Sequence, residues 1–157
     1  MEQLVFLKTE EKACALTGHR DLSGLDKALL KDELERLIKD GVEVFYNGLA
    51  LGFDLLAAEI LLKLKKTYSH VKLIGCAPFP KQAKAYPAEE KKRYEKIVKC
   101  LDELVYVCDH YTKFCYFSRN DYMCERADVL LAFLRKQTGG TAYTVKRFQK
   151  KGRVIFI

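Results

Sequence analysis

The sequence lacks an apolar run long enough to span a bilayer, and its start lacks the pattern of a secretory signal. The most apolar region, residues 49–64, is interrupted by Asp54 and Glu59, whereas a spanning helix needs about 20 mostly apolar residues. The first residues have no basic start, no full apolar stretch and no small-residue cleavage site. We therefore expect a cytoplasmic protein that does not contact a membrane.

The six cysteines include no CxxC pair. Three of them, Cys14, Cys76 and Cys108, lie in apolar runs, where a thiol behaves as a small hydrophobic group. Reduced cysteines in a reducing cytoplasm are the simplest interpretation. The residues that come nearest to a zinc set are Cys108, His110, Cys115 and Cys124. Their spacing matches no usual zinc pattern, so the sequence predicts no metal.

Several catalytic and cofactor motifs are also missing. No GKS or GKT ends a P-loop, and no GxGxxG marks a dinucleotide fold. Neither HExxH nor HxxEH is present, and no Ser/His/Asp or Cys/His ordering suggests a nucleophilic enzyme. These absences argue against the common hydrolase and metalloenzyme classes, and we predict no cofactor.

The composition is that of one globular domain. The chain has 157 residues, of which 49% are hydrophobic and 31% charged, and it contains no linker, repeat or low-complexity tract. We therefore expect a single domain over residues 1–157. The net charge of +7 favours phosphates or polyanions without saying which. Basic runs at 91–93 and 150–151 are typical of solvated helix faces.

Apolar runs of strand length alternate with segments of helical period. Strands are predicted at 13–17, 42–46, 71–77, 104–108, 129–133 and 154–157, with a further edge strand at 4–7. Helices are predicted at about 25–39, 53–66, 88–101, 119–126 and 141–150. Strands that are apolar on both faces need helices above and below. The pattern predicts an α/β three-layer sandwich with a mostly parallel central sheet of about six strands.

Glycine and polar residues gather where the predicted strands end. They are Gly18, His19 and Arg20 after the first strand, Asn47, Gly48, Gly52 and Asp54 after the second, Pro78, Phe79 and Pro80 after the third, and Thr138, Gly139, Gly140 and Thr141 after the fifth. In a parallel sheet these points lie along one edge, where such folds bind ligands. We expect them to line a single crevice.

The pair Gly139-Gly140 before Thr141 has two interpretations. Glycines permit close approach of the backbone, and the free N–H groups at a helix start favour an anion. The threonine hydroxyl adds a donor. The alternative is a plain helix N-cap, a position that threonine fills well.

The remaining polar residues leave similar alternatives open. Asp54 suits a helix start for the dipole alone, and Glu59 either faces the crevice or pairs with a base. The guanidinium of Arg20 is suited to bind a phosphate or carboxylate with two hydrogen bonds. Arg119 with Asn120, expected just before a helix, would supply a second such group. His19 is either a general acid–base group or a turn residue.

Taken together, these motifs resemble a known family. They are Thr17-Gly18-His19-Arg20, Gly48-x-x-x-Gly52-x-Asp54-x-x-Ala57-Ala58-Glu59, Pro78-x-x-x-Gln82, Arg93-Tyr94, Ser118-Arg119-Asn120-x-x-Met123 and Gly139-Gly140-Thr141-x-x-Thr144-Val145. Their order from about residue 13 to 157 resembles the YpsA-like branch of the SLOG superfamily, which is named for the DNA-processing protein DprA and the Lonely Guy enzymes.

The resemblance implies a Rossmann-like fold whose pocket suits nucleotides and nucleotide-derived ligands. It implies that Gly18 and Arg20 form the first loop's contact, and that Gly48, Gly52 and Asp54 shape the second. It also implies that Gly139, Gly140 and Thr141 hold a phosphate, with Arg119 and Asn120 at the pocket rim. A homodimer is a further expectation from relatives that pair through helices.

The likeness departs from the Lonely Guy enzymes at their catalytic glutamate. Those enzymes cleave the sugar–base bond of a nucleoside monophosphate with a GGxGTxxE segment, and Thr144 stands where that glutamate would be. Threonine cannot act as a carboxylate that stabilises a cationic sugar. A non-catalytic binding domain is therefore favoured, and Asp54 and Glu59 are the candidate acids or bases if a reaction takes place.

Three functions follow from these observations. The first is binding or sensing of a nucleotide-derived, phosphate-bearing small molecule at the strand ends. The second is single-stranded DNA binding of the DprA type, for which the candidate stacking residues are Tyr86, Tyr94, Tyr111, Tyr116 and Phe117. The third is a nucleotide-cleaving, phosphoribohydrolase-like enzyme.

Overall fold

The computed structural model describes residues 11–157, so the predicted edge strand at 4–7 lies outside the described residues. Strands and helices alternate along the chain as the apolar pattern predicts. The strands are β1 (Ala13–Gly18), β2 (Val44–Asn47), β3 (Lys72–Ala77), β4 (Glu103–Tyr106), β5 (Val129–Phe133) and β6 (Arg153–Phe156). The helices are α2 (Lys27–Lys39), α3 (Phe53–Leu64), α4 (Ala88–Cys100), α5 (Cys115–Arg126) and α6 (Gly140–Gln149), with a short 3-10 turn, η1 (Gln82–Ala85), after β3.

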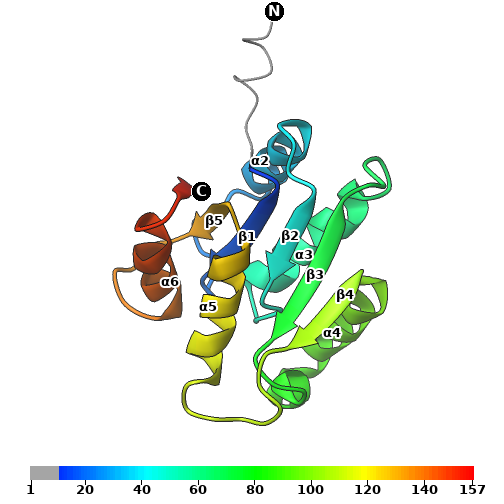
Figure 1. Ribbon diagram of the computed structural model, residues 1–157. Helices are drawn as coiled ribbons and strands as arrows, with labels where there is room; N and C mark the ends of the chain where they lie inside the picture. Colours follow the sequence, from blue (N-terminus) through cyan, green and yellow to red (C-terminus); the bar gives the residue numbers. More distant parts are fainter. Residues whose placement is uncertain (1–10) are drawn as a thin grey trace, which may run out of the picture.

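The six strands form one sheet in the order β4-β3-β2-β1-β5-β6, and every pairing is parallel. The α/β, Rossmann-like arrangement is therefore confirmed. From β1 the chain moves outward to β4, then returns to place β5 on the other side of β1 (Figure 1). The connections that leave β1 and β5 thus run in opposite directions. A crevice forms at such a switch point, beyond the carboxyl ends of the strands.

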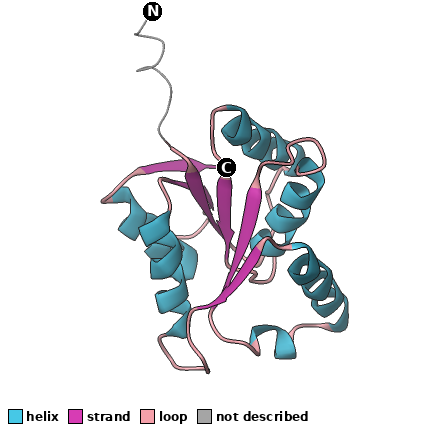
Figure 2. Ribbon diagram, turned by 45° about the vertical axis from the view of Figure 1, so that its right-hand side comes forward, coloured by secondary structure: helices cyan, strands magenta, loops and turns pink. Residues whose placement is uncertain are grey.

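The sheet lies between two layers of helices, with α2, α3 and α4 on one face and α5 and α6 on the other (Figure 2). Alternate residues of the central strands face opposite layers. Cys14 and Leu16 of β1 join the core under α2, α3 and α4, whereas Ala15 joins the core under α5 and α6. The second core is smaller and includes Met123 of α5 and Phe148 of α6.

Helix α5 begins at Cys115, earlier than the predicted start near Arg119. Its buried side chains are Cys115, Arg119, Met123 and Cys124. These positions share one helical face, but the buried arginine and the exposed Tyr116 hide the apolar period on which the prediction rests. Arg119 and Asn120 therefore lie inside the helix, and the expectation that they precede it was wrong.

The helices differ in how the backbone N–H groups of their first turns are hydrogen-bonded. At α2, the N-cap Asp26 accepts a hydrogen bond from the N–H of Leu29 at 3.1 Å. Helices α3 and α6 instead begin after Gly52 and Gly139, which have φ angles of 85° and 94° and no side chain to cap the helix. Both glycines adopt a backbone conformation that other residues rarely take. At α3 the N–H of Phe53 donates to the carbonyl of His19 at 3.1 Å, whereas the space beside Gly139 at the start of α6 is open.

None of the described helices is long and apolar enough to cross a membrane.

Candidate functional site

A hollow of about 380 Å³ lies beyond the carboxyl ends of β1 and β5. Its lining comes from the segment that follows β1, the starts of α3 and α6, and the inner face of α5. The predicted site residues in it are Gly18, His19, Arg20, Asp54, Arg119, Asn120, Gly139, Gly140 and Thr141. The chain therefore brings together residues from both halves of the sequence at the switch point.

The start of α6 opens into this hollow. No side chain caps the helix, and Thr141 lies inside it, so the interpretation of Thr141 as a plain N-cap was wrong. A Cβ atom added to Gly139 would meet nothing within 4 Å, and one on Gly140 would meet only Asn120 Nδ2, at 3.8 Å. The space above these amides is open. An uncapped helix start with free amides and a positive dipole end is suited to bind an anion.

His19 holds the loop that leads to α6. Its Nε2 accepts hydrogen bonds from the backbone N–H groups of Arg135, at 2.8 Å, and Lys136, at 3.3 Å. Burial, together with the charges of Lys136 and Arg135, lowers the pKa of the imidazole, which keeps it neutral and able to accept. Of the two predicted roles for His19, this geometry is that of a turn residue.

Gly48 does not line the hollow, but its carbonyl oxygen fixes two side chains beneath it. That oxygen accepts hydrogen bonds from Arg119 Nη1 and, at 3.1 Å, from Gln82 Nε2. A Cβ on residue 48 would lie 2.6 Å from Arg119 Nη1 and 2.8 Å from Asp54 Oδ2. Only glycine lets both side chains approach this closely. Arg119 is 6% exposed, so it lies below the hollow rather than at its rim.

Gly52 and Pro78 also lie outside the hollow. A Cβ on Gly52 would be 2.3 Å from the backbone oxygen of Arg20, so this glycine serves the close packing of two loops. Pro78 is buried at the end of β3, and its carbonyl accepts the N–H of Cys108 at 2.9 Å.

Asp54 is the acidic side chain of the hollow. It is 6% exposed, and its Oδ2 accepts the N–H of Ala50 at 3.2 Å. Its Oδ1 accepts no hydrogen bond from any residue that the structure describes. Burial raises the pKa of this carboxyl from 3.8 to about 6, against the opposing charge of Arg119. A buried carboxylate with an unused oxygen is costly without a ligand.

Glu59 points to another part of the molecule. Both of its oxygens accept hydrogen bonds from Arg93, at 2.9 and 2.7 Å, in a two-pronged ion pair between α3 and α4. Of the two alternatives for Glu59, pairing with a base is the one observed. Only Asp54, of the two candidate catalytic carboxylates, lines the hollow.

Thr144 is fully buried, and its hydroxyl donates to the carbonyl of Gly140 at 2.9 Å. The residue at the position of the Lonely Guy glutamate is thus a packing residue in the first turns of α6. The hollow offers one carboxylate, several cationic groups and free amides.

Sequence reasoning did not assign Lys136 or Tyr116 to the ligand site, although both line the hollow. Lys136 sits in the loop between β5 and Gly139, and a basic residue just ahead of a glycine pair is a signal that could have identified it. Tyr116 belongs to the misplaced start of α5, and the guanidinium of Arg119 lies 5.9 Å from its ring centre.

The five predicted stacking aromatics separate into two groups. Tyr86 and Tyr94 contact each other edge to face at 5.8 Å, and Tyr94 is buried in the core. Tyr111, Tyr116 and Phe117 are exposed by 60%, 43% and 43%. The exposed group adjoins the hollow through Tyr116.

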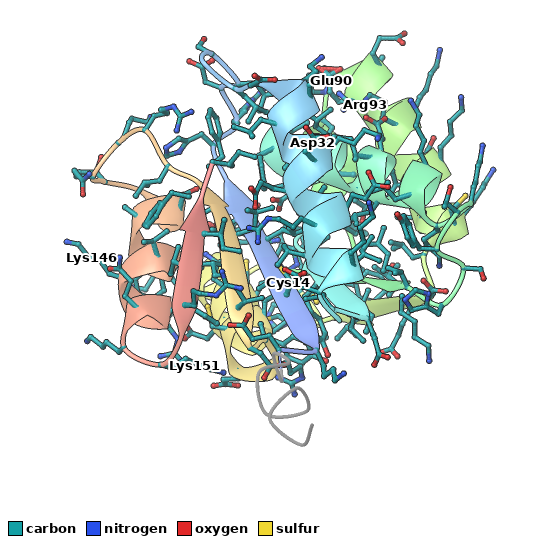
Figure 3. All side chains as sticks on the ribbon, turned by 90° about the horizontal axis from the view of Figure 1, so that it is seen from above. Cys14, Asp32, Glu90, Arg93, Lys146 and Lys151 are labelled. Carbon is teal, nitrogen blue, oxygen red and sulfur yellow. The ribbon has the colours of Figure 1, made fainter. Side chains whose placement is uncertain are left out.

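A larger hollow of about 590 Å³ lies on the outer side of α5 and α6, where Figure 3 shows Lys146 and Lys151. It is basic, but its cations are partly paired. Arg147 contacts Asp121 at 3.0 Å, and Lys151 donates to the carbonyl of Cys124 at 2.7 Å. This hollow has no glycine loop and no helix start among its lining residues, so we favour the hollow at the switch point.

Within residues 11–157, no group of three or more His, Cys, Asp or Glu side chains is placed so that it could hold a metal ion. The described residues thus offer no ready metal centre.

A doubly wound parallel sheet with a hollow at its switch point defines a Rossmann-like α/β class. The sequence comparison is more specific. The model of the YpsA family, described as the YspA SLOG family, matches residues 17–154. The chain belongs to this SLOG family, which confirms the predicted resemblance.

Proteins named UPF0398 match most of this chain and a smaller share of their own length. A UPF0398 protein of Halalkalibacterium halodurans is 29% identical over 140 residues, covering 85% of this chain and 71% of that protein. A UPF0398 protein of Bacillus thuringiensis is 28% identical over 161 residues, covering 91% and 85%.

Two solved structures share the fold. DprA from Streptococcus pneumoniae matches with a TM-score of 0.69 and 21% identity, over 94% of this chain and 50% of that one. DprA from Helicobacter pylori, described by its single-stranded DNA binding mode, matches with a TM-score of 0.60 and 22% identity, over 92% and 65%. The chain thus spans only part of either DprA protein, and at these identities the likeness concerns the fold.

Proposed function

We propose that the hollow binds a nucleotide-derived, phosphate-bearing small molecule, with the phosphate at the start of α6. The observation that carries the proposal is the uncapped first turn at Gly139 and Gly140, which opens into the same hollow as Arg20, Arg119 and Lys136. Its volume of about 380 Å³ lies within the range of small-molecule sites.

The charged side chains around the start of α6 support the binding of an anionic ligand. Arg20 is exposed, and its guanidinium makes no ion pair with any residue that the structure describes. Lys136 is exposed on the loop that His19 fixes. Arg119 uses Nη1 for Gly48 and Nε for Asn120, while its Nη2 donates to no residue within 11–157. These groups leave several donors for phosphate oxygens.

A thermal-shift panel of nucleotides tests the proposal. We expect at least one phosphate-bearing nucleotide to stabilise the protein, and we expect Gly140→Asp and Arg20→Ala to weaken that effect at least tenfold in ligand concentration. Gln149→Glu, which adds a negative charge at the exposed far end of α6, is the matched control. A panel without any stabilising nucleotide would overturn the proposal.

Single-stranded nucleic acid is the second candidate, and the exposed aromatics favour it. Tyr111 and Tyr116 both contact Phe79 edge to face, at 5.6 and 6.2 Å, and Tyr116 reaches the hollow. Bases can stack on such side chains beside a cationic groove. The DprA structure from Helicobacter pylori, which concerns single-stranded DNA binding, has the same fold.

A gel shift with a single-stranded oligonucleotide at low and high salt tests this candidate. Binding that weakens steeply with salt, and that weakens further in Tyr116→Ala, would support it. An absence of any shift at low salt would eliminate it. Pairing of two chains stays a prediction of the family resemblance, and the mass of the free protein in solution tests it.

A further inference from the structure

Asp54 is out of place in a hollow that otherwise favours anions. The cationic groups of the lining are Arg20, Arg119 and Lys136, and Asp54 is the acidic side chain among the lining residues. A carboxylate repels a phosphate, so it weakens the binding of phosphate alone. The N–H of Ala50 and the charge of Arg119 account for part of its position, and Oδ1 is left for another part of the ligand.

The carboxyl group has an acceptor to spare. Oδ2 accepts the N–H of Ala50, whereas Oδ1 has no donor among the described residues although Asp54 is only 6% exposed. Buried carboxylate oxygens are normally hydrogen-bonded, and an ionised carboxylate can only accept. Asp54 Oδ1 therefore lacks a hydrogen-bond donor within the described residues, and a ligand in the hollow can supply one.

The surrounding charges limit which donor this is. An ammonium group would meet the repulsion of Arg20, Arg119 and Lys136 in the same hollow. A neutral hydroxyl avoids that cost and still donates to the carboxylate. A ligand with a phosphate at one end and hydroxyl groups a few ångströms away satisfies both parts of the hollow, and a ribose phosphate has this arrangement.

The neighbours of Asp54 also hold it in one position. The N–H of Ala50 donates to Asp54 Oδ2 at 3.2 Å, and Asn47 Nδ2 donates to the backbone oxygen of Asp54 at 2.8 Å. A fixed acceptor discriminates more sharply than a mobile one, because it cannot turn away to water when the ligand lacks the hydroxyl.

We infer that Asp54 accepts a hydrogen bond from a ribose hydroxyl, so that the hollow selects ribonucleotides over nucleotides without these hydroxyls. This inference rests on the proposed function and names the class of ligand. It also separates the two candidate functions, since DNA lacks the 2′ hydroxyl.

Titration calorimetry with the four ribonucleoside 5′-monophosphates and their 2′,3′-dideoxy counterparts tests the inference. We expect the wild-type protein to prefer the ribonucleotide by about tenfold or more, the usual effect of a hydrogen bond to a charged group. In Asp54→Asn the preference should shrink to a few-fold, mainly because the ribonucleotide binds more weakly. Asp32→Asn, on the exposed side of α2 (Figure 3), should keep the full preference.

The wild-type protein gives a second test that does not depend on folding of the variant. Arg119, Cys76 and Tyr86 interact electrostatically with Asp54. The other charged or titratable side chains in the hollow are His19, Arg20, Tyr116 and Lys136. Burial raises the pKa of the Cys76 thiol and the Tyr86 phenol, so both stay neutral near pH 6. The carboxyl of Asp54, whose pKa is about 6, loses its charge as the pH falls, and the ribose preference should fall with it. Titration of His19 and of the phosphate affects both nucleotides alike, so the ratio isolates Asp54.

Equal affinity for the two nucleotide series, or a preference that survives both Asp54→Asn and acid pH, would overturn the inference and leave the proposed function intact. Failure of both series to bind would overturn the proposed function, and the inference with it.

Discussion

Helices α3 and α6 start in the same way, but their first turns have different surroundings. Each follows a parallel strand and begins after a glycine with positive φ, at Gly52 and Gly139, without a side-chain cap. At α3 the space is filled, because Gly52 packs on the backbone of Arg20 and the N–H of Phe53 donates to the carbonyl of His19 at 3.1 Å. At α6 the space above Gly139 is empty. A glycine before a helix does not by itself show whether the helix start is packed or can bind an anion. The atoms that surround the glycine make that distinction.

Substituting each glycine gives the largest contrast between the two helix starts. Gly52→Ala adds a Cβ 2.3 Å from a backbone oxygen at a φ of 85°, so we expect a loss of more than 3 kcal/mol in the free energy of unfolding. Gly139→Ala meets no atom and should cost only the unfavourable backbone conformation, about 1–3 kcal/mol. Urea unfolding of the two variants measures both. Similar losses would show that the two loops are equally packed.

The pH dependence of stability tests Asp54, which lies in the first turn of α3. Its pKa is raised in the folded state, so the folded protein holds this proton more tightly than the unfolded chain. Stability is therefore greatest below the unfolded value near 4, and it falls as pH rises toward about 6. The expected loss is about 2–3 kcal/mol.

Asp54→Asn removes this titration and is the reference for the measurement. The difference in free energy of unfolding between wild type and variant should change between pH 4 and 7 and be constant above that range. A difference that is the same at every pH would contradict the burial of an ionisable group at this position.

Glu59→Gln should give a smaller effect, because this residue of α3 lies away from the hollow. Its ion pair with Arg93 is about one-third exposed on each side, so its loss should cost about 0.5–1 kcal/mol. Nucleotide affinity should be unchanged within twofold. A large loss of affinity would show that α3 contributes to the site beyond Asp54.

Gly140→Asp should have the smallest effect on stability and a large effect on binding. A carboxylate in the first turn of a helix is favourable by about 0.5 kcal/mol, and the added Cβ clashes with nothing. The same charge occupies the place of the phosphate. Thermal unfolding without nucleotide should show a slightly higher midpoint, and a lowered midpoint would show that this turn is packed rather than open.

The order of strands and helices could be predicted from the sequence because the apolar runs of the sheet core are uninterrupted. Val129–Phe133 is fully buried, and its predicted bounds match those of β5. The start of α5 could not be predicted, since the buried Arg119 breaks the apolar period that identifies a helix.

The residues that line the hollow could be predicted only in part, because the sequence shows where strands end but not which distant residues meet there. Residues directly after strands, such as Arg20 and Gly140, follow from the parallel sheet. Their partners depend on contacts far apart in the sequence. His19 bonds to residues 135 and 136, and Glu59 bonds to Arg93 rather than facing the hollow. A pattern along one chain does not specify which of several nearby charges a carboxylate will meet.

A crystal structure of the protein with a ribonucleoside 5′-monophosphate tests the central claim most directly. The phosphate should accept hydrogen bonds from the backbone N–H groups of Gly140 and Thr141, within reach of Arg20 or Lys136. A phosphate in the larger basic hollow beside Lys146 and Lys150, with the start of α6 left empty, would contradict it.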